Sequence, residues 1–117
     1  MTSGDIVLIR LPQVGGTAPK LRPALVLAFL PGPYQNVLLC GISTQLQLLQ
    51  DDWDEPIQAT DDDFKQTGLQ RDSAARLSYL YAADPSEITG TIGRIDTARL
   101  GRLRTRLANH LLGSPSV

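Results

Sequence analysis

A proline stands near the start of a long apolar run, Arg22–Leu30 (RPALVLAFL), and this arrangement restricts the fold more than any other feature of the chain. The unbroken Val, Leu and Ala residues predict a strand buried on both faces or one wall of a small barrel. Proline suits the first residue of such a strand, because it has no N–H to donate to a ladder. Pro23 also confines the residue before it to extended backbone. We therefore expect Arg22 at a fixed place on a strand end, either as solvated surface or as an anion-binding fork.

Further short apolar segments follow, separated by clusters rich in Gly and Pro. Their length and composition predict strands at 5–11, 22–30, 37–44, 55–60, 72–84 and 89–95. The Gly- and Pro-rich segment 12–20 (PQVGGTAPK) is too long for a tight hairpin turn and predicts a loop.

Two helices are expected. The first covers 60–68, where Thr60 suits the N-cap, three aspartates suit the positive helix N-terminus and Gly68 suits the end. This placement explains the aspartates without a metal site. The second helix begins at Asp96 as its cap, and its leucines recur at helical spacing, at positions 100, 103, 107 and 111, before Gly113. The segment 85–88 (PSEI) suits a single helical turn.

Short strands first, a short helix between them and an amphipathic helix at the end predict an α+β domain. The expected form is a small, partly open antiparallel β-barrel with the two helices added. A length of 117 residues suits one domain, 1–117, whose last residues, 113–117 (GSPSV), we expect to be frayed.

The single cysteine, Cys40, lies in an apolar segment, so we expect a small core residue and neither a disulfide nor a metal site. The N-terminal segment lacks the basic region of a signal peptide, and no apolar run approaches the roughly 18 residues of a membrane span. A cytoplasmic protein without membrane contact is expected. His110 has no Cys, Ser or second His near it, which favours a surface or packed histidine over a catalytic one.

The net charge of −1 conceals a separation of signs along the chain. The segment 50–64 holds seven carboxylates and no cation, whereas 93–107 holds five arginines and one aspartate. Such a separation allows a basic face for an anionic partner, although a solvated surface is the commoner outcome.

Several motifs together resemble the MazF/PemK family of bacterial toxins. In chain order they are GDIVLIRLP (4–12), RPALVLA (22–28), GISTQ (41–45), DFKQTGLQRDSAARLSYL (63–80) and TIGRID (91–96). The resemblance covers nearly the whole chain. It implies an SH3-like barrel, a homodimer, and a sequence-specific endoribonuclease of single-stranded RNA that a cognate antitoxin inhibits.

The resemblance also implies the site. Arg22 matches the family arginine that receives the scissile phosphate, and a Ser-Thr pair faces it. Arg76 matches a further arginine that is functional in some members. The candidate catalytic residues are therefore Arg22, Thr44 and Arg76. The candidate substrate-binding residues are Lys20, Ser43, Gln45 and Ser78.

This set of residues suits the chemistry. A phosphodiester attacked by its own 2′-OH develops negative charge, which a rigid guanidinium and a hydroxyl can stabilise. The product would be a 2′,3′-cyclic phosphate or its hydrolysis product, and neither a metal nor another cofactor is expected. We expect the loop 12–20 to receive splayed bases of single-stranded RNA, with Lys20 on a phosphate.

The chain departs from the family pattern at two places. Ser78 replaces an acidic residue that has been proposed as a general base, and a serine is a poor base at neutral pH. Tyr81 and Ala82 replace a frequent Arg-Thr pair. The proton acceptor is therefore left unassigned. Two alternatives stay open: a weakened or inactive module that binds RNA or antitoxin on the same fold, and a gyrase-inhibiting toxin, which would not require Arg22 beside Ser43 and Thr44.

Overall fold

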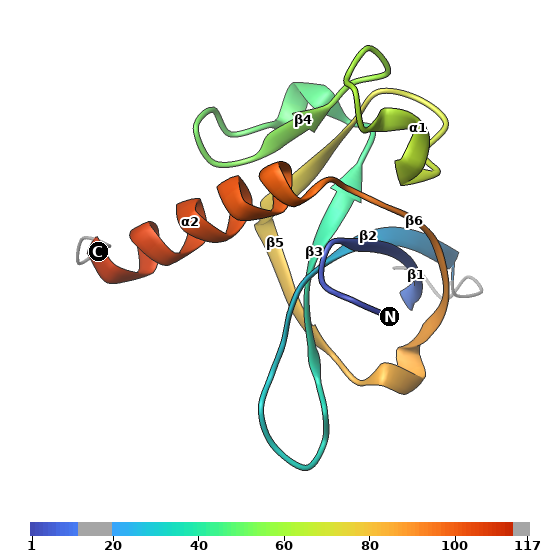
Figure 1. Cartoon of the computed structure of the whole chain (residues 1–117), viewed down its shortest axis with the longest axis vertical. Helices are drawn as coiled ribbons and strands as arrows, with labels where there is room; N and C mark the ends of the chain where they lie inside the picture. The colour runs from blue at the N-terminus through green and yellow to red at the C-terminus, as the bar shows by residue number, and fades with distance from the viewer. Residues whose placement is uncertain (12–19, 114–117) are drawn as a thin grey trace.

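All six strands form one antiparallel sheet, in the order β4-β5-β3-β2-β1-β6 (Figure 1). The computed structural model describes residues 1–11 and 20–113. The strands are β1 (Asp5–Leu11), β2 (Lys20–Phe29), β3 (Val37–Ser43), β4 (Glu55–Ile57), β5 (Ser73–Ala83) and β6 (Ile88–Arg94). The helices are α1 (Phe64–Thr67) and α2 (Thr97–Gly113), with the short 3₁₀ turns η1 (Leu46–Leu48) and η2 (Pro85–Glu87).

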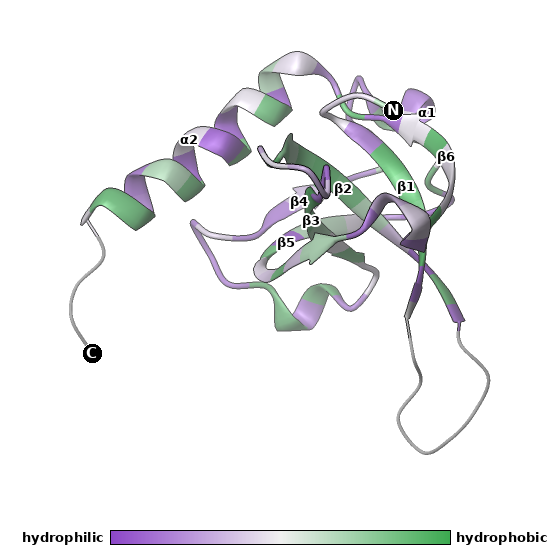
Figure 2. Cartoon of the chain, turned by 90° about the horizontal axis from the view of Figure 1, so that it is seen from below, coloured by the Kyte–Doolittle hydropathy of each residue, from purple (hydrophilic) through white to green (hydrophobic). Residues whose placement is uncertain are grey.

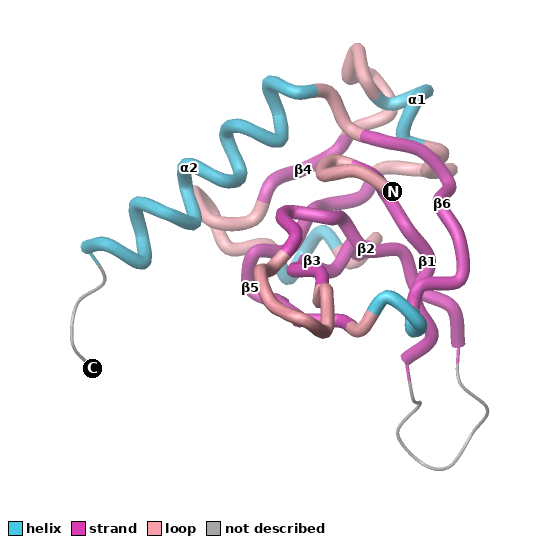
Figure 3. Tube along the Cα trace, turned by 60° about the horizontal axis from the view of Figure 1, so that its bottom comes forward, coloured by secondary structure: helices cyan, strands magenta, loops and turns pink. Residues whose placement is uncertain are grey.

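The sheet has two edges, β4 and β6, so no ladder among the described residues closes it into a barrel. The predicted α+β fold is confirmed as an open six-stranded antiparallel sheet with a C-terminal helix, and the SH3-like form of the barrel stays a prediction. Figure 3 shows that the chain turns back so that α1 lies beside β6. The approach is close, because a Cβ on Gly68 would lie 2.2 Å from the carbonyl oxygen of Ile92. A Cβ on Gly93 would lie 2.3 Å from the backbone of Thr67.

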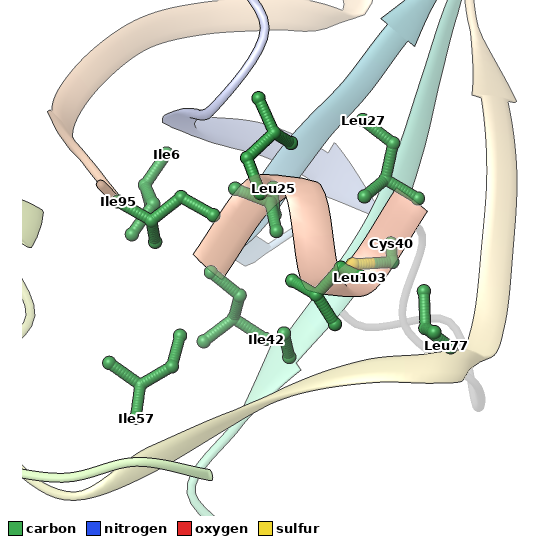
Figure 4. Close-up of a cluster of buried hydrophobic side chains, with 11 residues drawn as sticks. Ile6, Leu25, Leu27, Cys40, Ile42, Ile57, Leu77, Ile95 and Leu103 are labelled. Atoms are coloured by element: carbon green, nitrogen blue, oxygen red, sulfur yellow. The ribbon is translucent and has the colours of Figure 1, made fainter. Parts of the chain in front are cut away.

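Strand β2 is buried on both faces, as its unbroken apolar run predicts. Leu25 and Leu27 belong to one core cluster, which Figure 4 shows packed beneath α2, and Ala24 and Val26 belong to a second cluster. Figure 2 shows hydrophobic residues along β2. Cys40 is fully buried in the first cluster, which confirms its role as a small core residue.

The start of β2 differs from the prediction. The strand begins at Lys20, so Pro23 is its fourth residue rather than its first. Pro23 is tolerated there because the ladder between β2 and β3 begins only at Ala24. The pairing of β2 with β1 extends back to Lys20. Of the predicted loop, residues 12–19 lie outside the described residues.

The first helix is shorter than predicted, and its cap is not Thr60. It starts after Asp63, whose side chain makes no capping hydrogen bond, and it ends as expected at Gly68 with φ of 74°. The predicted Thr60 cap is therefore wrong, whereas the aspartates do precede the helix N-terminus, with Asp63 at the N-cap position. The turn predicted at PSEI is confirmed as η2, where the Asp84 side chain accepts a hydrogen bond from Ser86 N–H.

The C-terminal helix follows the prediction at its start. Asp96 Oδ1 accepts a hydrogen bond of 2.7 Å from the Arg99 N–H. Leu103 is fully buried, whereas Leu111 is 69% exposed, because the second half of α2 extends away from the sheet (Figure 1). Gly113, expected to belong to a frayed end, is the last residue of α2, and 114–117 lie outside the described residues.

Three arginines of α2 pair with the acidic segment, whereas Arg104 is exposed and donates to the Leu27 carbonyl. Arg99 is only 7% exposed and pairs with Glu55, Asp61 and Asp63, at 2.9 Å in each case. Arg102 and Arg106 also pair with Glu55. The two segments of opposite sign therefore neutralise each other within the chain, and the basic face that the sequence allows is largely occupied.

The aromatic side chain of Trp53 packs on the ring of His110, with 4.8 Å between ring centroids. This contact supports the interpretation of His110 as a packed histidine. In the part of the chain that the structure covers, no helix is both long and apolar enough to cross a membrane.

Candidate functional site

A cavity of about 310 Å³ opens over β2, β3 and β5, on the side of the sheet that holds the second core cluster. Its polar lining comes from four residues that the sequence predicts for the site: Arg22, Ser43, Gln45 and Arg76. Its apolar lining includes Ile9, Ala24, Leu39, Tyr79 and Tyr81. Residues that are far apart in sequence thus meet in one concave place.

Arg22 is held by the β1–β2 ladder, in which it lies opposite Ile9. Its side chain is exposed and, among the described residues, makes no ion pair or hydrogen bond. Lys20 lies two residues earlier on the same strand and therefore shares the face of Arg22, but it does not line the cavity. The backbone of Arg22 is fixed while its guanidinium remains available.

The end of β3 supplies a hydroxyl to the cavity. Ser43 Oγ accepts a hydrogen bond of 3.0 Å from the Gln45 N–H, which leaves the hydroxyl proton of Ser43 free to donate. Thr44 lies between these two lining residues and is exposed, but it does not itself line the cavity. Of the predicted pair, Ser43 is therefore the member at the site.

Arg76 enters the cavity from β5 and is anchored from behind by a carboxylate. Its Nε donates a hydrogen bond of 2.9 Å to Oδ2 of Asp54, whose side chain is fully buried. Its two terminal nitrogens have no hydrogen-bond partner within residues 1–11 and 20–113. One edge of the guanidinium is thus held and the other is unoccupied.

Ser78 does not join the cavity lining. Its hydroxyl lies 3.0 Å and 3.1 Å from the two carboxylate oxygens of Asp54, and its N–H donates to Oδ1 at 3.0 Å. The acidic residue expected two places after Arg76 is therefore replaced, in space, by a carboxylate from the segment before β4.

Burial raises the pKa of Asp54, but hydrogen bonds from Gln50 and Ser78 and the charge of Arg76 outweigh it and hold the pKa below its ordinary value. Burial, with the nearby charge of Asp54, raises the pKa of the Cys40 thiol to about 12. Asp54 is therefore ionised at neutral pH, and Cys40 is a neutral, unreactive thiol.

Two tyrosines form the apolar wall of the cavity. Tyr79 is half exposed, and its ring covers Gly41, where an added Cβ would lie 3.1 Å from the ring. The Tyr81 hydroxyl donates to Glu87, and this bond raises the pKa of Tyr81. Both rings are placed for contact with a flat ligand, and Tyr81 stays a neutral phenol at neutral pH.

No group of three or more His, Cys, Asp or Glu side chains arranged to hold a metal ion occurs among the residues that the structure describes.

Comparison with known proteins places the chain in a family. The model of the family described as PemK-like, MazF-like toxin of type II toxin-antitoxin systems matches residues 2–111. The chain belongs to this toxin family. A comparison with curated protein sequences gave no match. Among solved structures, the Mycobacterium tuberculosis toxin MazF-mt6 has a similar fold, with a TM-score of 0.65 and 20% identity over 92% of this chain and 95% of that one.

The sequence reasoning missed Asp54, Tyr79 and Tyr81. The structure explains Asp54, because β4 pairs with β5 with Glu55 opposite Ala75, which sets Asp54 opposite Arg76. Opposite charges across a ladder attract each other. The pairing of β4 with β5 was not evident, because β4 is only three residues long.

Proposed function

We propose that this PemK/MazF-family toxin is a metal-independent endoribonuclease that cleaves single-stranded RNA at particular sequences. The observation that supports it most is the convergence of Arg22 and Arg76, from different strands, with the Ser43 hydroxyl on one cavity. Two guanidiniums and a hydroxyl donor match the charge and geometry of a phosphodiester.

In this proposal the RNA supplies its own nucleophile. Its 2′-OH attacks the adjacent phosphorus, and the bond from phosphorus to the 5′-oxygen of the next nucleotide breaks, leaving a 2′,3′-cyclic phosphate and a 5′-hydroxyl. Arg22 and the unoccupied edge of Arg76 stabilise the charge on the non-bridging oxygens, and Ser43 donates a further hydrogen bond. Asp54 is fully buried and hydrogen-bonded, so it does not receive the 2′-OH proton.

The tyrosine wall supplies sequence preference in this proposal. Bases of single-stranded RNA stack on exposed aromatic rings, and Tyr79 offers such a ring beside the arginines. Further parts of the proposal follow from the family: a cognate antitoxin that inhibits the toxin, a homodimer in solution, and action in the cytoplasm.

The test is incubation of the purified chain with end-labelled single-stranded RNA in buffer containing EDTA. We expect discrete fragments that end in a 2′,3′-cyclic phosphate. A matched RNA with a 2′-deoxy nucleotide at the cleaved position should stay intact, because it lacks the nucleophile. Absence of cleavage at high protein concentration, with an active relative cutting the same RNA, would refute the proposal.

A second candidate function rests on Ser78, which stands where an acidic residue is expected and is bound to Asp54. A site with two cations but no assigned proton acceptor can bind RNA without cutting it. RNA that binds with a shift in electrophoretic mobility and stays intact would favour this non-catalytic module.

A further inference from the structure

Strand β5 carries a bulge beside the cavity. Gly41 pairs with Arg76, but the preceding residue, Cys40, pairs with Leu80, so one step along β3 corresponds to four steps along β5. Residues 77–79 therefore leave the β3 ladder. Bulges next to active sites redirect side chains, and here Arg76, just before the bulge, and Tyr79, within it, both line the cavity.

A carboxylate stabilises this bulge. The Ser78 N–H, at the centre of the bulge, donates to Oδ1 of Asp54 at 3.0 Å, and the same carboxylate binds the Arg76 Nε at 2.9 Å. The Ser78 N–H has left the β3 ladder, and Asp54 gives it a hydrogen-bond acceptor although the residue is exposed. One side chain thus holds both the backbone of the bulge and the guanidinium at its edge.

Asp54 is itself held on both sides. Its N–H donates to the Gln50 carbonyl at 2.9 Å, and its Oδ2 accepts a hydrogen bond of 3.0 Å from the Gln50 N–H. The next residue, Glu55, starts β4 and pairs with Ala75. The carboxylate is therefore fixed by a closed turn before it and a ladder after it, and its fully buried side chain cannot reach a ligand in the cavity.

We propose that Asp54 is a positioning residue for the candidate active site: its carboxylate fixes Arg76 and the β5 bulge in the arrangement that binds the reacting phosphate. The role rests on the proposed ribonuclease function. Asp54 acts through Arg76 and does not itself touch RNA. Because its contact uses Nε, the two terminal nitrogens of Arg76 stay together as a fork for phosphate oxygens.

The experiment is a double-mutant cycle of RNA cleavage with Asp54→Asn, Arg76→Ala and the double variant. Asp54→Asn keeps the shape of the side chain but removes its charge. We expect kcat to fall roughly 10- to 100-fold with a smaller change in KM, as misplacement of a catalytic group does. Asp54→Asn should cause no further loss when Arg76 is already Ala. Asp51→Asn, at an exposed position of the same segment, is the matched control and should cut like the wild type.

Independent losses that multiply in the double variant would overturn the role, because they would mean that Asp54 does not act through Arg76. Wild-type kcat for folded Asp54→Asn would overturn it as well. Should Asp54→Asn fail to fold, Arg76→Lys serves instead, because a lysine amine keeps a cation beside Asp54 but offers no fork. Full activity of Arg76→Lys would contradict the proposal.

An NMR measurement separates this proposal from the proposed function. The Nε–H of Arg76 should exchange slowly with water in the wild type, whereas that of Arg71, which is exposed, should exchange fast. A rapidly exchanging Arg76 Nε–H would refute the contact itself. If the wild type does not cut RNA, the ribonuclease proposal and this role fail together, although the slow signal would still show the Asp54–Arg76 contact.

Discussion

Replacement of Arg99 by methionine should destabilise the fold more than any other single change at an arginine. The guanidinium of Arg99 donates to Glu55, Asp61 and Asp63 and to the carbonyl of Pro56. Methionine fills a similar volume but leaves these acceptors without their donor. The network joins α2 to β4 and to the segment before α1, so its loss also loosens the helix from the sheet.

The magnitude follows from burial. Removing one partner of a buried ion pair costs about 3 to 5 kcal/mol, because the remaining charge is left uncompensated. Glu55 keeps its ion pairs with Arg102 and Arg106 in this variant. The loss of stability therefore falls mainly on Asp63, whose side chain is 3% exposed and retains, among its described donors, only the Asp96 N–H at 3.1 Å. We therefore expect a loss near the lower limit, about 3 kcal/mol, and a fall in Tm of roughly 10 °C or more.

Urea denaturation at neutral pH measures this loss as a lower midpoint at unchanged slope. Arg102→Met is the matched control: its side chain is 54% exposed, so the loss should stay below about 1 kcal/mol. The difference between Arg99→Met and the wild type should shrink in acid, where Asp63 can take up a proton. A loss below about 1 kcal/mol for Arg99→Met would refute the claim that this network is buried and coupled.

Further predictions concern pH, backbone packing and RNA contact. The pKa values of Asp54 and Asp63 lie below the ordinary 3.8. The two carboxylates therefore contribute their full share to the free energy of unfolding above that value, and this share is lost as pH falls through their folded pKa. Urea denaturation should accordingly show falling stability between about pH 4 and about pH 2. Gly93→Ala should destabilise the protein by more than about 1 kcal/mol, because its Cβ would meet the Thr67 backbone. Gly101→Ala, on a helix with open space around it, should stabilise the protein by about 0.5–1 kcal/mol. Thermal melts that rank the two variants the other way would contradict this packing. Tyr79→Ala should weaken RNA binding by about 1–3 kcal/mol in fluorescence anisotropy, and unchanged binding would remove the stacking role.

Strands β1, β2 and β3 were predictable from the sequence because each is a short apolar segment bounded by Gly, Pro or Asn. The alternation of Leu25 and Leu27 with Ala24 and Val26 between two core clusters is what an unbroken apolar run requires. The start of β2 at Lys20 was not predictable from the sequence. Residues 20–23 pair with β1 alone, because the ladder with β3 begins only at Ala24.

Long-range contacts account for the errors. Asp61 and Asp63 suited a helix N-terminus by local rules, but their partner is Arg99, 36 residues beyond Asp63. The approach of α1 to β6 is likewise a long-range contact, which no local pattern encodes. The glycines at 68 and 93 are the only local trace of this approach, and each also suits an ordinary turn or strand end.

The site was predictable in part. Arg22, Ser43, Gln45 and Arg76 line one cavity, whereas Thr44 does not. Thr44 follows Ser43, the last residue of β3, and the resemblance to the family did not show which member of this pair lines the cavity. Asp54 was hidden in an acidic segment whose members look alike in sequence, and only the fold shows which of its carboxylates contacts Arg76.

The most direct test of the central claim compares RNA cleavage by Arg22→Ala with that by Arg71→Ala. Both remove an exposed arginine, but only Arg22 lines the cavity. Loss of one charge-stabilising group predicts a fall of at least about 100-fold in kcat for Arg22→Ala, with the free energy of unfolding within about 0.5 kcal/mol of the wild type. Arg71→Ala should cut at the wild-type rate. Equal cleavage by the two variants would contradict the assignment of this cavity as the active site.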